Sequence, residues 1–184
     1  MGIDGIVVVA GVPGSGKTTL ARDLAPELDM PLLSKDTIKE ALFDALGTGD
    51  LARSRAFGRV AHVVLYALAA EARSAVLESN FWPGTAEGEL VALRRPLVQV
   101  YCPCPIEIAV ERYRRRATSP DRHPGHLPEH QSEHAIAGWT AAAAVPLALD
   151  APLLEVDTTT PVDAACLAAE IMRLFSSHRT PVQS

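Results

Sequence analysis

Residues 6–19 read IVVVAGVPGSGKTT, and this segment sets the expected fold class of the chain. The apolar, mostly β-branched run 6–9 predicts a buried strand of a parallel sheet. It leads directly into 11–18, a complete match to the pattern G-x-x-x-x-G-K-[ST]. Residues 18–24 have the pattern of a helix, so the motif has the strand–loop–helix setting of a P-loop.

The chemistry of such a loop depends on its glycines, its lysine and the threonine that follows. Glycine lets backbone N–H groups converge on a phosphate without a Cβ clash, and the start of the next helix adds its positive dipole end. Lys17 would neutralise the β- and γ-phosphates, and the Thr18 hydroxyl would ligate Mg²⁺. The candidate nucleotide-binding residues of the loop are Gly11, Pro13, Gly14, Ser15, Gly16, Lys17, Thr18 and Thr19.

The composition limits what this chain can be. Its 184 residues, 48% of them apolar, predict one folded domain over residues 1–184. Seventeen basic and 22 acidic residues give a net charge of −5, which argues against a general nucleic-acid-binding protein. No apolar run approaches the roughly 20 residues that span a bilayer, and no secretory signal is apparent. We therefore expect a cytoplasmic protein without a membrane partner, whose three cysteines form neither a disulfide framework nor a four-ligand zinc pattern.

Short apolar runs and helical segments alternate along the rest of the chain. Strands are expected at 3–9, 31–33, 75–78, 97–101 and 152–156, and helices at 18–28, 36–47, 51–73, 105–117 and 162–175. Asp50 is expected to cap the third of these helices. This alternation predicts an α/β fold, a five-stranded parallel sheet with helices on both faces. Ligands bind at the carboxyl ends of such strands, so the residues just after each strand are the functional candidates.

Acidic residues follow the second and third expected strands. Asp36 would lie near the γ-phosphate, where a carboxylate can accept the proton of an attacking hydroxyl or hold the metal; the alternative is that it caps the next helix. Glu78 ends an apolar strand, as in a Walker B site. It is a candidate for contact with Mg²⁺ or substrate, against a purely structural hydrogen bond. Trp82 follows closely and either stacks on the substrate or packs in the core.

Residues 111–123 hold five of the 14 arginines in an otherwise acidic chain. Arginine makes bidentate contacts with phosphate, and a segment after the fourth strand can close over a nucleotide as a lid. We expect at least one of Arg112, Arg116 and Arg122 to contact phosphate. The alternatives are a solvated helix face and a groove for nucleic acid.

Four of the six histidines lie within 123–134. His126, His130 and His134 are four residues apart and would share one face of a helix, as metal ligands can. Two prolines and a glycine favour a loop over the first half of the segment. Zinc binding, contact with substrate or phosphate within a lid, and a solvent-exposed loop are the alternatives.

Four segments together resemble a known group of enzymes. They are 11–19 (GVPGSGKTT), 34–39 (SKDTIK), 78–81 (ESNF) and 112–116 (RYRRR). They resemble the P-loop kinases of the zeta-toxin, chloramphenicol phosphotransferase and polynucleotide 5′-kinase type, an AAA_33-like ATP-binding group. The resemblance implies a nucleoside monophosphate kinase-like fold with an arginine-bearing lid, and transfer of the γ-phosphoryl group of ATP to a hydroxyl.

The resemblance also implies individual roles. Asp36 matches the group's general base, Lys39 its substrate-side cation and Arg116 its lid arginine. Thr158, after the fifth strand, is implied to lie near the adenine. The segment 123–126 has no counterpart that the resemblance explains, and a second basic lobe for tracking a nucleic-acid strand is missing.

These observations predict an ATP- and Mg²⁺-dependent kinase that acts on a hydroxyl of a small molecule, such as a metabolite or an antibiotic. The lid is expected over about 112–134. The acceptor is expected between a long helix that carries Arg55, Arg59 and His62 at one-turn spacing and the loop of Trp82. The candidate acceptor-site residues are Asp36, Lys39, Arg55, Arg59, Glu78, Trp82 and Arg122.

Two other functions remain open on the sequence. One is a kinase for a 5′-hydroxyl of nucleic acid, which the acidic net charge makes the less favoured acceptor. The other is a regulatory P-loop ATPase without an acceptor. A monomer or a homodimer is expected in either case.

Overall fold

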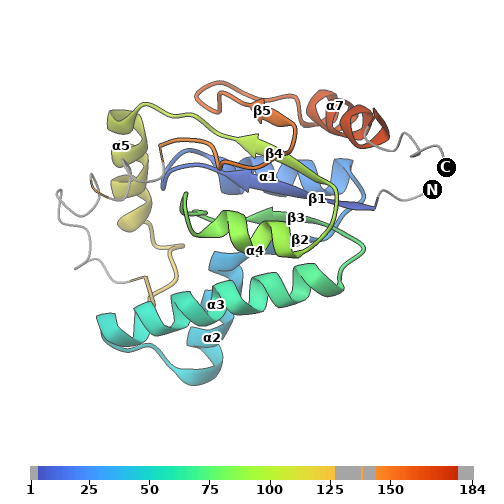
Figure 1. Cartoon of the computed structure of the whole chain (residues 1–184). Helices are drawn as coiled ribbons and strands as arrows, with labels where there is room; N and C mark the ends of the chain where they lie inside the picture. Colours follow the sequence, from blue (N-terminus) through green and yellow to red (C-terminus); the bar gives the residue numbers. More distant parts are fainter. Residues whose placement is uncertain (1–3, 127–137, 139–143, 178–184) are drawn as a thin grey trace.

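The computed structural model describes residues 4–126, 138 and 144–177. It has a five-stranded sheet in which every neighbouring pair is parallel, with the strand order β2-β3-β1-β4-β5 (Figure 1). The strands are β1 (Gly5–Ala10), β2 (Leu32–Ser34), β3 (Ser74–Glu78), β4 (Leu97–Tyr101) and β5 (Leu153–Glu155). All five expected strands are present, and the α/β P-loop fold class is confirmed.

Five of the six described helices agree with the expected ones in position. The six are α1 (Lys17–Glu27), α2 (Lys35–Leu46), α3 (Leu51–Glu71), α4 (Ala86–Ala92), α5 (Ile106–Ala117) and α7 (Ala164–Ser177). The sequence did not predict α4, a seven-residue helix with a glycine in its middle. Leu90 of α4 is fully buried, so packing rather than local propensity stabilises this helix.

The central strand β1 is buried along its whole length and has helices on both sides. Its side chains alternate between the two faces of the sheet. Val7 and Val9 pack with residues of α1 and α7, whereas Ile6 and Val8 pack with residues of α3 and α4 (Figure 1). An apolar run without polar alternation is therefore the pattern that this strand requires.

Two helix starts bear on the predictions. Asp50 caps α3 as expected, because its Oδ1 accepts a hydrogen bond of 2.9 Å from the backbone N–H of Arg53. Asp36 does not cap α2: the capping position is Ser34, and Asp36 lies in the first turn of the helix. The capping alternative for Asp36 is wrong, which leaves its carboxylate available for another role.

The parallel arrangement brings the carboxyl ends of the strands to one edge of the sheet. The loop 11–16 follows β1, Asp36 lies two residues after β2, Glu78 ends β3 and Thr158 follows β5.

None of the described helices combines the length and the apolar character that a membrane-spanning helix needs.

Candidate active site

The backbone of the P-loop is held in a conformation that requires glycine. Gly14 has φ +85° and Gly16, which precedes α1, has φ +88°, and both values favour glycine. A Cβ on Gly14 would also collide with the backbone carbonyl of Ala109 in α5. The loop after β1 therefore lies directly against the helix that carries the arginine cluster.

Lys17, the first residue of α1, points into this loop. Its Nζ donates a hydrogen bond of 3.4 Å to the Val12 carbonyl and lies 4.0 Å from Oε1 of Glu78. The side chain is 7% exposed. Burial lowers the pKa of Lys17, and the carboxylates of Glu78 and Asp36 act in the opposite direction. A phosphate at this position would supply the strong anionic partner that the buried ammonium lacks.

Glu78 accepts hydrogen bonds from two hydroxyl groups. The Thr18 Oγ1 donates to its Oε1 at 3.0 Å, and the Ser34 Oγ donates to its Oε2 at 2.7 Å. Strand register explains the second contact, because Ser34 of β2 pairs with Glu78 of β3. Glu78 is only 2% exposed. The sequence prediction missed Ser34, although its position as the last residue of a strand before Asp36 marks it as a site residue.

The residues around Thr18 fit a magnesium ion. Mg²⁺ takes one or two oxygen ligands from the protein and completes its shell with phosphate and water, and a hydroxyl beside a carboxylate supplies such oxygens. Among the described residues there is no group of three His, Cys, Asp or Glu that could hold a metal by itself. Ser15 Oγ is buried without a hydrogen-bond partner in the described structure.

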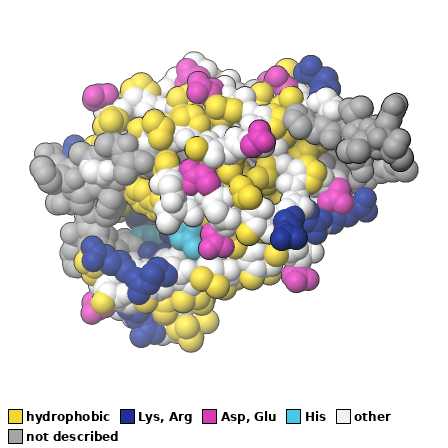
Figure 2. All heavy atoms as spheres, in the orientation of Figure 1, with side chains coloured by type: hydrophobic (Ala, Val, Ile, Leu, Met, Phe, Trp, Pro, Cys, Tyr) yellow, Lys and Arg dark blue, Asp and Glu magenta, His cyan; other side chains and the backbone are white. Residues whose placement is uncertain are grey.

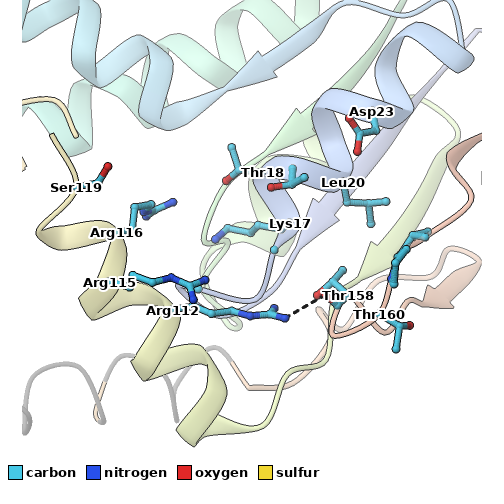
Figure 3. Close-up of a pocket in the computed structure, with 15 residues that line it drawn as sticks. Lys17, Thr18, Leu20, Asp23, Arg112, Arg115, Arg116, Ser119, Thr158 and Thr160 are labelled. Carbon is cyan, nitrogen blue, oxygen red and sulfur yellow. Dashed lines mark hydrogen bonds between the residues drawn. The ribbon is translucent and has the colours of Figure 1, made fainter. Parts of the chain in front are cut away.

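A cavity of about 690 Å³ opens between the P-loop, α5 and the segment after β5 (Figure 3). Figure 3 shows Arg112, Arg115 and Arg116 of α5 on one side of this cavity, with Lys17 and Thr18 facing them. The residues that line it are Gly14, Gly16, Lys17, Thr18, Thr19, Leu20, Asp23, Arg112, Arg115, Arg116, Ser119, Thr158, Thr160, Pro161 and Val162. We call it the nucleotide cavity.

Thr158 closes one wall of the nucleotide cavity. Its hydroxyl donates to the carbonyl of Ser15, and its own carbonyl accepts a hydrogen bond of 3.4 Å from Arg112 (Figure 3). Thr158 thus joins the P-loop to α5. Of the loop residues predicted to bind nucleotide, Gly11, Pro13 and Ser15 do not line this cavity.

A second cavity of about 290 Å³ lies beside the first, toward α2 and α3. Two of its lining residues, Lys17 and Arg116, also line the nucleotide cavity. The full lining is Pro13, Lys17, Lys35, Asp36, Lys39, Leu51, Ser54, Arg55, Gly58, His62, Ser79, Asn80, Trp82, Tyr113, Arg116, Arg122 and His126. We call it the acceptor cavity. Figure 2 shows Lys and Arg side chains beside a recess in which histidine is exposed.

Asp36 brings the only carboxylate among the described lining residues into the acceptor cavity. Its Oδ1 accepts a hydrogen bond of 2.9 Å from Lys35 Nζ. Burial raises the pKa of Asp36, but the charge and hydrogen bond of Lys35 and the charges of His126 and Lys17 outweigh burial and hold it well below its usual range. The carboxylate is therefore ionised at neutral pH.

The structure brings most of the predicted acceptor-site residues together, with two exceptions, Glu78 and Arg59. Lys39, Arg55, Trp82 and Arg122 line the acceptor cavity, as does His62, whose Nε2 lies 3.0 Å from Ser79 Oγ. Glu78 is buried beneath this edge of the sheet and does not line the cavity.

Arg59 is the second exception, because it does not line the cavity, although Arg55, which does, is exposed as well. Arg59 lies one helical turn beyond Arg55, about 40° further round the helix, just outside the face that lines the cavity. Ser54 lies on that face, and the sequence prediction missed it; its signal was its spacing of four residues from Gly58 on the same helix face.

The segment after α5 packs against α2. His126 Nε2 lies 2.8 Å from Oε1 of Glu40, and His123 Nε2 lies 3.1 Å from Oδ1 of Asp44. Gly125 lies against the ring of Phe43, which a Cβ there would overlap. Burial lowers the pKa of His126, although the carboxylates of Asp36 and Glu40 act against it.

Of the segment that was predicted to be a lid, Tyr113, Arg116, Arg122 and His126 line the acceptor cavity. The later part of the predicted lid, including His130 and His134, lies outside the described residues, and so does the zinc hypothesis that depends on them.

A lysine-bearing P-loop after the central strand of this sheet, faced by arginines from α5, defines a P-loop nucleotide-binding protein with a kinase-type fold. The profile of the AAA_33 family, described as an AAA domain, matches residues 6–142, and the chain belongs to this family.

Three proteins illustrate the likeness. A crystal structure from Chloroflexus aurantiacus, described as that of a candidate kinase, is 34% identical with a TM-score of 0.85, over 94% of this chain and 98% of that chain. A gluconokinase from Sinorhizobium meliloti is 17% identical with a TM-score of 0.61, over 97% of this chain and 95% of that one, and it shares the fold. A cytidylate kinase from Pyrobaculum neutrophilum is 50% identical over 42 residues, which span only 23% of either chain.

Proposed function

We propose that this protein is an ATP- and Mg²⁺-dependent kinase that transfers the γ-phosphoryl group of ATP to a hydroxyl of a small molecule. One observation carries the proposal: Lys17 and Arg116 line both the nucleotide cavity and the acceptor cavity, so a phosphoryl group moving from one cavity to the other passes between two cations. The kinases among the similar proteins support the reaction type.

The size of the acceptor cavity supports a small acceptor. About 290 Å³ is close to the lower end of ordinary small-molecule sites, which begin at roughly 300 Å³. A hydroxyl compound of metabolite size fits this space. We further propose that residues 1–184 form one kinase domain whose lid spans about 112–134.

The residues divide the work by their positions. Thr18 and Glu78 would hold Mg²⁺, which supplies charge neutralisation at the phosphates when bound. Lys17 and the P-loop amides bind the β- and γ-phosphate oxygens, and Arg116 stabilises the charge that develops during transfer.

Asp36 acts on the acceptor side. Its ionised carboxylate orients the acceptor hydroxyl and takes its proton as the oxygen bonds to phosphorus and the bond to ADP breaks. Because its pKa is low, Asp36 is a weak base, so the proton would move late, when the attacking oxygen has already become acidic.

An ADP-release screen against hydroxyl compounds tests the proposal, with Lys17→Ala and Asp36→Asn as comparison variants. We expect one or more compounds to accelerate ADP release well above the rate in water. Lys17→Ala should abolish this activity. Asp36→Asn should lower transfer about 10²- to 10⁴-fold while the slow hydrolysis of ATP stays unchanged.

Three results would contradict the proposal. If no acceptor exceeds water and ATP hydrolysis alone persists, a regulatory ATPase is the better description. If oligonucleotides with a 5′-hydroxyl are the best acceptors, with binding that weakens steeply with salt, the nucleic-acid kinase is correct. Full transfer activity in Asp36→Asn would remove Asp36 from the mechanism.

A further inference from the structure

The acceptor cavity has a large excess of positive charge. Among the described residues, its lining includes one carboxylate, Asp36, and these six cationic side chains: Lys17, Lys35, Lys39, Arg55, Arg116 and Arg122. The chain as a whole has a net charge of −5, so this excess does not reflect the average composition.

The nucleotide does not account for all of these cations. Lys17 and Arg116 also line the nucleotide cavity, so the transferring phosphoryl group would face both. Arg112 and Arg115 line only the nucleotide cavity and are available for the rest of the polyphosphate. Lys35 is paired with Asp36.

Lys39, Arg55 and Arg122 remain without a carboxylate partner within 4 Å among the described residues. Lys39 Nζ donates to a neutral group, Ser54 Oγ, at 2.9 Å. Arg122 lies over the ring of Tyr113 at 5.3 Å, and its buried Nε has no hydrogen-bond partner in the described structure.

Lys39 and Arg122 are partly buried, whereas Arg55 is exposed, so the cost of a cation without a close anionic partner falls on the first two and is visible at Lys39. Burial and the nearby charges of Lys35 and Arg122 lower the pKa of Lys39 to about 8, although the more distant carboxylates of Asp36 and Glu40 act against them. An anionic group bound between these side chains would remove that cost and would satisfy the free Nε of Arg122.

We propose that the acceptor of this kinase carries an anionic group, a carboxylate or a phosphate, in addition to the hydroxyl that is phosphorylated, and that Lys39, Arg55 and Arg122 bind that group. The inference rests on the proposed function, because it assigns the substrate class of the same site. It excludes uncharged antibiotics and free sugars as the preferred acceptors.

Matched pairs of hydroxyl compounds test the charge requirement directly. Glycerate and glycerol, gluconate and glucitol, and glucose 6-phosphate and glucose differ in whether an anionic group is present, and the pairs separate carboxylate from phosphate. ADP release with saturating ATP and Mg²⁺ gives kcat/KM for each compound. We expect at least one anionic compound to exceed its neutral partner by roughly 10- to 100-fold.

Two arginines of α3, one helical turn apart, provide a test variant and its matched control. Both side chains are exposed, but Arg55→Ala removes a cation that lines the cavity, whereas Arg59→Ala removes the same charge from a position that does not line it. Arg55→Ala and Lys39→Met should each raise KM for the anionic acceptor about tenfold or more and leave kcat less changed, while Arg59→Ala should behave like the wild type.

A binding measurement separates failure of this inference from failure of the proposed function. Isothermal titration of glycerate, gluconate and glucose 6-phosphate into protein saturated with a non-hydrolysable ATP analogue needs no turnover. Binding that weakens in Lys39→Met and Arg55→Ala but not in Arg59→Ala supports the anion site even if no compound is phosphorylated, in which case only the kinase proposal fails.

Two outcomes overturn the inference. The first is that neutral compounds are phosphorylated as efficiently as their anionic partners, which leaves the kinase proposal standing. The second is that anionic probes neither react nor bind, or that they bind equally well to wild type and to Arg55→Ala and Lys39→Met.

Discussion

Thr18 at the start of α1 and Glu78 at the end of β3, sixty residues apart in the sequence, are joined by a hydrogen bond of 3.0 Å between Oγ1 and Oε1. The same carboxylate accepts from Ser34 of β2. Three neighbouring elements of the fold therefore meet at one buried acidic group, directly beside the lysine of the P-loop. This arrangement fixes the hydroxyl that we assign to Mg²⁺.

Replacing Glu78 with glutamine should weaken Mg²⁺ dependence without removing the side chain. We expect the Mg²⁺ concentration for half-maximal activity to rise about 10- to 100-fold, because the charge beside Thr18 is lost. Titration of activity with Mg²⁺ measures this shift. Ser34→Ala is the control for a lost hydrogen bond alone and should shift the titration much less; equal shifts in the two variants would argue against metal binding at Glu78.

Arg116 and Arg115 are neighbours in α5 that differ in what they line. Only Arg116 lines both cavities, so Arg116→Ala should lower kcat by roughly 10³-fold or more, as expected for an arginine that stabilises the transferring phosphoryl group. Arg115→Ala should raise KM for ATP and change kcat little. Steady-state kinetics with both substrates varied distinguishes the two effects, and similar kcat values in the two variants would rule out the special role of Arg116.

The pKa of Lys39 predicts a pH dependence. Burial lowers it to about 8, so the cationic form is present below that pH and is lost as the pH rises through it. We expect kcat/KM for an anionic acceptor to fall above about pH 8, because the free enzyme loses a binding charge. Lys39→Arg keeps the charge and should move the decline to higher pH; an unchanged decline in this variant would mean that another group titrates.

Two glycines offer opposite effects on stability. Gly14 has φ +85°, and Gly14→Ala places a Cβ against the Ala109 carbonyl. We therefore expect this variant to lower the free energy of unfolding by about 1–3 kcal/mol and to abolish nucleotide binding. Gly88→Ala lies within α4 with open space around the new Cβ and should stabilise the protein by about 0.5–1 kcal/mol. Thermal unfolding of both variants checks the pair, and a stable, ATP-binding Gly14→Ala would refute the close packing of the P-loop on α5.

The sheet could be predicted from sequence because its signal is local. Each strand is a short apolar run, and the P-loop follows β1 without a gap. The short helix α4 could not be predicted, because Gly88 weakens its propensity and burial of Leu90 compensates only in the folded protein.

The acceptor cavity was predictable only in part. Asp36 and Lys39 follow a strand and could be found by position. Arg55 and Arg59 are one helical turn apart and look equivalent in the sequence, and only the three-dimensional structure shows that Arg55 lines the cavity and Arg59 does not. The contact of His126 with Glu40 joins residues 86 apart and leaves no local pattern.

The chain contains three lysines, and all of them line the acceptor cavity. Apart from the N-terminal amine, every primary amine of the protein is therefore inside its candidate active site. Acetylation, formation of an isopeptide bond or coupling to an amine-reactive label cannot occur on a lysine elsewhere on the surface. Lys39, with its pKa of about 8, keeps a neutral, nucleophilic fraction near neutral pH, so the extent of its acylation would report directly whether the cavity is occupied.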